Sequence, residues 1–218
     1  PSTFWQDFRE GFRYIMAWRG LVILLGLVMV INFFFSAIEP LTPLLITKHF
    51  KGNAAQLGWW LSLFSVGVLL GGLLLGIWGG FKRKIVTAQG GLVLMGLFAA
   101  IIGFLPENML WAGMVINMLF GLTQPIVNGS YGATLQAAIA PDMQGRVFSF
   151  IFSAAMLVSP LALMISGPFA DRFGIQIMFV IAGVTCMLLG AAGFFIPDVM
   201  DFENSSKEKS FNATVDLS

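Results

Sequence analysis

Long apolar runs separated by short polar segments make up most of the chain. A membrane-spanning helix needs about 20 largely apolar residues to cross a hydrocarbon core about 30 Å thick. The runs that meet this requirement are Gly20–Ile38, Leu57–Trp78, Ile85–Leu105, Leu110–Ile139, Val147–Phe169 and Ile175–Ile196. The pattern therefore predicts an all-α integral membrane protein with six transmembrane helices.

The composition of the chain also indicates a lipid environment. Hydrophobic residues make up 57% of the 218 residues, charged residues only 11%, and the mean hydropathy is +0.86. A soluble globular protein has about 25% charged residues, so this chain cannot cover its own surface with polar groups. The sequence contains one cysteine and one histidine, which excludes a structural zinc site, and we expect no metal and no cofactor.

The basic residues are distributed unevenly between the two sets of connecting segments. If the N-terminus of the chain lies inside, the inner segments hold Arg9, Arg13, Arg19, Lys82, Arg83, Lys84, Arg146, Lys207 and Lys209. The outer segments then hold only Lys48, Lys51 and Arg172. Because cytoplasmic loops carry an excess of lysine and arginine, this bias predicts a multi-pass protein of the plasma (inner) membrane, with both termini of the segment in the cytoplasm.

Amphipathic or polar segments flank the apolar region at both ends. In residues 1–19, aromatic side chains recur at helical spacing, which predicts a cytoplasmic amphipathic helix on the membrane surface. Residues 20–197 make the predicted bundle, and residues 198–218 are a polar cytoplasmic tail. The chain begins at Pro1 rather than at a methionine, so we expect it to be a piece of a longer protein.

Two segments rich in glycine and charge begin in the last residues of the second and fifth runs and continue beyond them: "GIWGGFKRK", which begins at Gly76, and "GPFADRFG", which begins at Gly167. They lie 91 residues apart, and the same offset carries the starts of the first three runs to within one residue of the starts of the last three. Three helices followed by three more cross the membrane in the opposite sense, so the second triplet is predicted to be an inverted copy of the first. Convergence is the alternative, because tight connections between helices favour glycine and charge anyway.

Four segments resemble the C-terminal half of a major facilitator superfamily transporter, and more narrowly its macrolide-efflux and enterobactin-exporter branch. They are "FREGFRYI", "GGFKRK", "LQAAIAPDMQGRVFS" and "GPFADRFG". The resemblance covers nearly the whole chain and implies half of a 12-helix fold, with its six helices arranged as a 3+3 inverted repeat. Gly80 departs from the family, whose cytoplasmic loop normally carries an aspartate there, so the ion-pair gate ascribed to that aspartate is not carried over.

Polar side chains collect on one face of the fourth run. Asn117, Gln124, Asn128 and Tyr131 fall within roughly 60° of one another at about 100° per residue. Amides are costly in hydrocarbon, so this face either lines a wet cavity or forms hydrogen bonds between packed helices. In the resembling family the first and fourth helices of each half line the central cavity. The resemblance thus favours substrate binding by these residues, together with Asn32 of the first run.

Charged residues near the ends of the runs are candidates for gating and coupling. Asp142 can pair with Arg146 four residues on, which favours either a gate that re-pairs between states or an ordinary anchored helix start. Glu39 is the carboxylate nearest to any run, so it is the candidate for ion coupling. Further gating or loop candidates are Asp171, Arg172, Lys82 and Arg83.

The function that these features favour is secondary active transport. A cavity of amides and apolar side chains suits a bulky amphiphile, such as a drug or a siderophore, exported by ion-coupled alternating access. The expected partners are the lipid bilayer, the substrate and either a missing N-terminal six-helix half or a second protomer; no nucleic acid is expected. The alternatives are an uptake carrier for another solute, or a six-helix intramembrane enzyme or scaffold. The single histidine lies outside the runs and no two aspartates lie inside them, which disfavours an enzyme.

Overall fold

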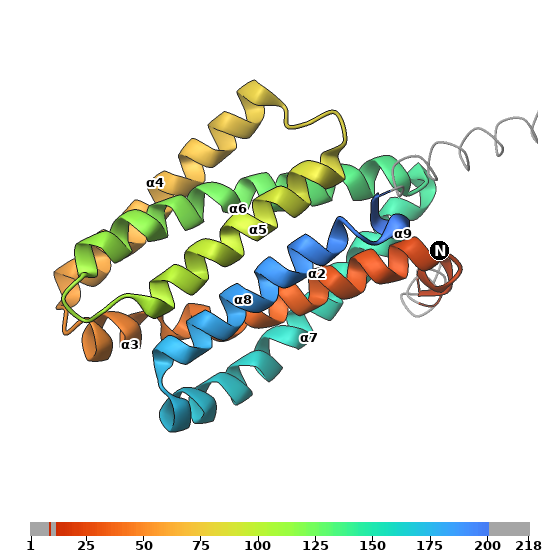
Figure 1. The fold of residues 1–218 in the computed structure, drawn as a ribbon. Helices are drawn as coiled ribbons and strands as arrows, with labels where there is room; N and C mark the ends of the chain where they lie inside the picture. The colour runs from red at the N-terminus through yellow and green to blue at the C-terminus, as the bar shows by residue number, and fades with distance from the viewer. Residues whose placement is uncertain (1–8, 10–11, 201–218) are drawn as a thin grey trace, which may run out of the picture.

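The computed structural model describes Arg9 and residues 12–200. Within that part the chain is helical and contains no strand, and six of its helical segments are long and apolar enough to cross a membrane. The predicted all-α fold with six transmembrane helices is therefore confirmed (Figure 1). Most of the predicted N-terminal amphipathic helix and the polar tail beyond residue 200 lie outside the described residues.

The first span consists of α2 (Arg19–Ile38) followed by three short helical pieces, which carry it to His49. These pieces are η1 (Glu39–Leu41), α3 (Thr42–Leu44) and the π-helical turn η2 (Leu45–His49). The remaining helices are α4 (Ala54–Trp78), α5 (Lys84–Phe104), α6 (Leu110–Ala138), α7 (Pro141–Phe173), α8 (Ile175–Gly193) and α9 (Pro197–Met200).

Two of the predicted runs end well before the helical spans that contain them. The first run was expected to end at Ile38, but helical structure continues because proline is tolerated in the first turn of each new helical piece. The fifth run was expected to end at Phe169, with "GPFADRFG" as a loop. Instead α7 reaches Phe173, and only Gly174, with φ of 96°, separates it from α8. Polar residues end an apolar run, but they do not end a helix.

Successive spans run in opposite directions, so the bundle has two ends. We name them the Lys82 end and the His49 end, each after a residue that lies there. The main helix pairs are α4 with α6, α2 with α7, α5 with α6, α2 with α8, and α5 with α8. An inverted repeat relates the first three spans to the last three, so that α2 corresponds to α6, α4 to α7 and α5 to α8. Under this correspondence the pair α4–α6 becomes α7–α2, and the pair α5–α6 becomes α8–α2. The pair α5–α8 corresponds to itself. The arrangement matches the predicted inverted repeat, except that α7 also packs against α8 to about the same extent as α2 does, whereas α4 has no comparable contact with α5. Accordingly, α4 and α7 lie at opposite edges of the bundle (Figure 1).

Glycines allow two of these pairs to approach closely. A Cβ atom at Gly67 or Gly71 of α4 would overlap a backbone carbonyl oxygen of α6, that of Met118 or Leu122. Between α5 and α8, Gly96 and Gly183 stand in the same relation to the facing backbone. Small residues at such crossings are how membrane helices gain contact area when lipid offers no hydrophobic driving force.

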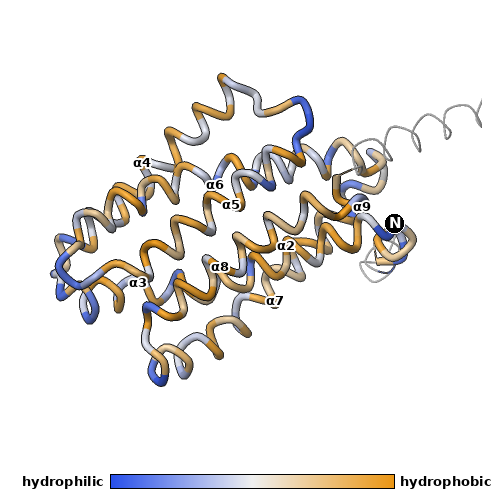
Figure 2. The backbone as a smooth tube through the Cα atoms, in the orientation of Figure 1, coloured by the Kyte–Doolittle hydropathy of each residue, from blue (hydrophilic) through white to orange (hydrophobic). Residues whose placement is uncertain are grey.

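The buried apolar side chains form two clusters, one toward each end of the bundle. The cluster at the Lys82 end includes Leu24, Leu92 and Leu135, and the cluster at the His49 end includes Leu45 and Met114. Along the helices apolar residues predominate, whereas the polar residues collect at the two ends (Figure 2). Because α4 and α7 leave most of their apolar residues unburied, these two helices must face lipid or another protein surface rather than water.

Candidate functional site

A cavity of about 490 Å³ lies where the two core clusters meet. Its walls come from α2 with η1 and α3, from α4, α5 and α6, and from one residue of α8. The helices that contribute most of the lining are the first and fourth spans, as the resemblance implied. The size is in the range of small-molecule sites, about 300–1,000 Å³.

Five of the six residues that we predicted for binding or coupling line this cavity: Asn32, Glu39, Asn117, Gln124 and Asn128. The sixth, Tyr131, does not line it. Tyr131 is 5% exposed and belongs to the core cluster at the Lys82 end, about one turn of α6 beyond the last lining residue of that helix. Whether the lining residues bind a substrate stays a prediction.

The sequence left two roles open for the polar face of the fourth run: to line a cavity, or to form hydrogen bonds between packed helices. The amide of Asn117 does both. Its Nδ2 donates a hydrogen bond of 2.9 Å to the backbone carbonyl of Trp60 and so joins α6 to α4. The same side chain lines the cavity. Asn32 is different, because its Nδ2 donates to the carbonyl of Val28, 2.9 Å away on its own helix.

Aromatic side chains form much of the remaining wall, and no pattern in the sequence distinguishes them from lipid-facing residues. Phe120 lies between Phe35 and Phe64, with ring centroids 5.5 Å and 6.0 Å away. Trp60 is only 2% exposed and also lines the cavity. Tilted aromatic pairs of this kind offer flat apolar surface at little cost in conformational entropy.

Comparison with known proteins agrees with this architecture. The model of the Major Facilitator Superfamily matches residues 18–216. The chain is 32% identical over 181 residues to macrolide efflux protein A of Streptococcus pyogenes, an alignment that covers 83% of this chain and 45% of the relative. It is 27% identical over 172 residues to the multidrug efflux pump Tap of Mycolicibacterium fortuitum, covering 77% of this chain and 41% of that pump. No solved structure matches.

The chain belongs to the Major Facilitator Superfamily. The predicted resemblance to this superfamily and to macrolide efflux proteins is thus confirmed. The six apolar spans make the chain a multi-pass membrane protein, and membership in this superfamily supports a transporter rather than an enzyme. The chain spans about half the length of the curated relatives that it matches, which fits half of a major facilitator fold.

Gly80, the position where this chain departs from the superfamily's aspartate, has a structural reason to be glycine. Its φ of 76° lies in the left-handed region, and the preceding Gly79 has a φ of 71°. A Cβ at Gly80 would lie 2.9 Å from Oγ1 of Thr87, which accepts a 2.8 Å hydrogen bond from the backbone N–H of Phe81. An aspartate here would disturb the turn that leads into α5.

The gating candidates lie at opposite ends of this major facilitator bundle. Lys82 and Arg83 are exposed in the segment before α5, whereas Asp171 and Arg172 are exposed in the last turn of α7. Pro141 occupies the first turn of α7. The Asp142–Arg146 gate and the coupling role of Glu39 stay predictions.

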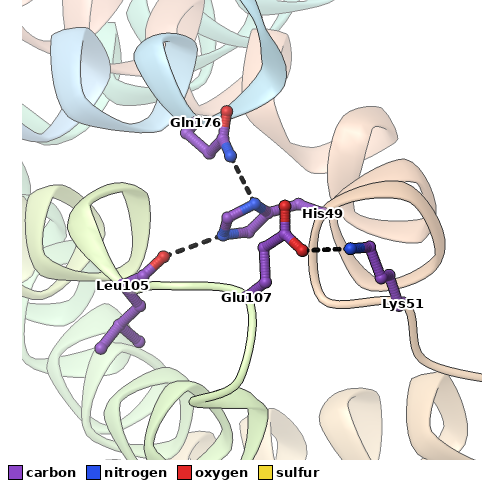
Figure 3. Close-up of polar contacts among 5 residues, drawn as sticks. All are labelled: His49, Lys51, Leu105, Glu107 and Gln176. Atoms are coloured by element: carbon purple, nitrogen blue, oxygen red, sulfur yellow. Dashed lines mark hydrogen bonds and ion pairs between the residues drawn. The ribbon is translucent and has the colours of Figure 1, made fainter.

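The His49 end of the first span is tied to two other parts of the chain. Nε2 of His49 lies 2.8 Å from the backbone carbonyl oxygen of Leu105, which follows α5, and Nδ1 contacts the side-chain amide nitrogen of Gln176 in the first turn of α8 (Figure 3). A carbonyl only accepts, so Nε2 carries the hydrogen and Nδ1 accepts from Gln176. The imidazole therefore joins three segments of the chain.

An exposed ion pair lies beside the imidazole. The Lys51 ammonium is hydrogen-bonded to the Glu107 carboxylate (Figure 3), and this hydrogen bond and the charge of Lys51 lower the pKa of Glu107. Because the pKa is lowered by folding, any stabilisation from the pair is present above the unfolded pKa and is lost as the pH falls through the folded one. Since both groups are exposed, the effect on stability is small.

We expect His49→Phe to lower the free energy of unfolding by about 1–3 kcal/mol. Phenylalanine keeps an aromatic ring next to Phe50 but leaves the Leu105 carbonyl and the Gln176 amide without their partner. Thermal unfolding in detergent would measure the change. The control is the exposed neighbour Lys48→Ala, which should change the stability by less than about 0.5 kcal/mol. Equal stability of His49→Phe and wild type would contradict the role of His49 in joining these segments.

Proposed function

We propose that this chain is one half of a secondary active transporter that exports a bulky amphiphilic molecule across the cell membrane by alternating access. The observation that carries the proposal is the cavity between the first and fourth spans, with its aromatic surface and its row of amides. Apolar walls with a few placed polar groups are what a small-molecule site requires. The efflux function named for the two relatives supports export rather than uptake.

The proposal includes a second half that completes the cavity, either a further six-helix segment or a second copy of this chain. In the described residues α4 and α7 expose apolar faces at opposite edges, and the relatives are about twice as long as the aligned segment. Transporters of this type place the substrate site between their repeats near the middle of the membrane. The polar lining residues of α6 lie in the middle of that helix and therefore suit this position.

Asn128→Ala and Gln124→Leu are expected to weaken the apparent affinity for the exported substrate about 2- to 12-fold each, because each loses one hydrogen bond of about 0.5–1.5 kcal/mol. The protein would be expressed with whatever its gene encodes on either side, in a drug-sensitive bacterium, and export of a macrolide and of fluorescent drugs would be measured. Thr185→Val on α8 lies away from the cavity lining and serves as the control.

Thermal unfolding of the same variants separates transport from packing. If the amides serve only packing, the variants will unfold at lower temperature while the molecules that remain folded keep their affinity. Unchanged transport in both variants would remove these residues from the site. The purified chain alone, as a monomer, should show no saturable flux, and saturable flux from it would contradict the proposal of a half transporter.

We also propose that the Lys82 end faces the cytoplasm. The support is the excess of lysine and arginine there. With Cys186 replaced, Lys82→Cys should resist impermeant thiol reagents in intact cells, whereas Arg172→Cys should be labelled. Both positions are exposed, so labelling reports the side of the membrane rather than burial. The opposite labelling pattern would reverse the orientation.

A further inference from the structure

The hydrogen bonds inside the cavity wall fix what its amides can offer to a ligand. The side chains of Asn32 and Asn117 each donate to a backbone carbonyl, of Val28 and Trp60 respectively. A carbonyl oxygen can only accept, so these bonds also fix which end of each amide is nitrogen. Each bond uses one of the two N–H donors and leaves both lone pairs of the amide oxygen unused.

The acceptor capacity of the wall therefore exceeds its donor capacity. The amides of Asn32, Asn117, Gln124 and Asn128 together with the Glu39 carboxylate offer roughly twelve acceptor sites, against about six remaining N–H donors. The hydroxyls of Ser36 and Thr42 and the indole N–H of Trp60 also line the cavity, and they bring the totals to roughly sixteen acceptor sites against about nine donors. Among the residues that line the cavity, Glu39 is the one charged side chain, and none is lysine, arginine or histidine. No basic group balances this excess of oxygen.

The apolar side of the cavity sets the shape of what fits against these acceptors. The rings of Phe35, Phe64 and Phe120 form one continuous tilted cluster on the wall. A ligand with a flat or ring-shaped apolar body would cover this surface. The polar edge of the ligand would then meet amide oxygens of the wall. A hydrogen-bond donor on that edge would pair with an amide oxygen, whereas an acceptor would leave both itself and the amide oxygen without a hydrogen bond.

We infer that the cavity selects amphiphiles whose polar edge carries several N–H or O–H donors, and that the amide oxygens of Asn32 and Asn117 accept hydrogen bonds from those donors. This inference rests on the proposed function, since it specifies the ligand of the same cavity. It assigns the selectivity to the direction of two hydrogen bonds within the protein rather than to charge or size.

The test compares two rhodamine esters of the same charge and ring system. One carries a secondary amine with an N–H group on each side of the ring system, and the other is fully N-alkylated and carries none. Binding to the purified protein, produced with all that its gene encodes, would be followed by fluorescence polarisation. We expect the N–H dye to bind about 2- to 12-fold more tightly for each donor that reaches the wall.

Asn32→Leu is the variant that tests the wall itself. Asn32 is preferable to Asn117, because its amide bonds only within its own helix, whereas Asn117 also joins α6 to α4. Asn32→Leu should reduce the preference for the N–H dye. Asn108→Leu, an exposed amide in the connection between α5 and α6, should leave it unchanged.

The outcomes distinguish this inference from the proposed function. Equal binding of the two dyes, tighter binding of the alkylated dye, or an undiminished preference in Asn32→Leu would overturn the donor selectivity of the wall and leave the exporter intact. If neither dye nor any member of a panel of amphiphilic drugs binds or is exported, the proposed function fails first.

Discussion

Gly71→Ala is expected to destabilise the protein by about 1–3 kcal/mol or more, whereas Gly72→Ala, one residue further along α4, is expected to be nearly neutral. The two substitutions add the same methyl group to the same helix. A Cβ at Gly71 would overlap the carbonyl oxygen of Leu122 and lie 2.9 Å from Cγ of Pro125, but a Cβ at Gly72 would meet nothing within 4 Å.

The effect is large because the obstructing atom at Gly71 belongs to the backbone. A flexible side chain can rotate away from an added methyl group, but the carbonyl of Leu122 can move only if α6 moves with it. The neighbouring turn has the same contact, between Gly67 and the carbonyl of Met118. The two helices would have to separate along two turns, which would remove much of the contact that holds α4 to the bundle.

Thermal unfolding in detergent and the yield of folded protein in the membrane would measure this pair of variants. Since α4 also supplies cavity residues, including Trp60 and Phe64, Gly71→Ala should lose transport together with stability. Equal stability of the two alanine variants would show that the close α4–α6 crossing does not exist in the membrane.

The six spans could be predicted from the sequence because apolar length is a local property, but the true ends of two spans could not. Glu39 and Pro40 end the first apolar run, yet the chain stays helical through a 3-10 and a π-helical piece as far as His49. In the same way Asp171 and Arg172 end the fifth run and still belong to α7. Their charges lie at a helix end, where water reaches them. They can therefore stay hydrated within the helix and do not interrupt it.

The helical wheel predicted the direction of the polar stripe but not the depth of the cavity. Asn117, Gln124 and Asn128 point to the cavity as the stripe required, and Tyr131 shares their direction but lies beyond the cavity floor. A wheel contains no information about how far along the axis the neighbouring helices separate. The aromatic wall was missed for a related reason, since a phenylalanine that faces a cavity and one that faces lipid look alike in sequence.

Gln89→Met is expected to raise the free energy of unfolding by about 1–3 kcal/mol, the opposite sign to most core substitutions. The Gln89 side chain is fully buried on α5, and neither its amide oxygen nor its amide nitrogen has a hydrogen-bond partner. It lies against α8, where a Cβ at Gly193 would overlap its amide group. Methionine keeps the length and approximate volume of glutamine but has no amide to remove from water.

The matched control is Gln124→Met, because that glutamine is only partly buried and its side chain lines the cavity. It should show no comparable gain in stability, since its amide is not enclosed without partners. Unfolding of the two variants would be compared in the same detergent and at the same pH. A lower stability of Gln89→Met than of wild type would mean that the amide is paired in the membrane, by a water molecule or by a group of the second half. In that case the inner part of the α5–α8 interface would have to be regarded as a polar contact rather than as closed apolar packing.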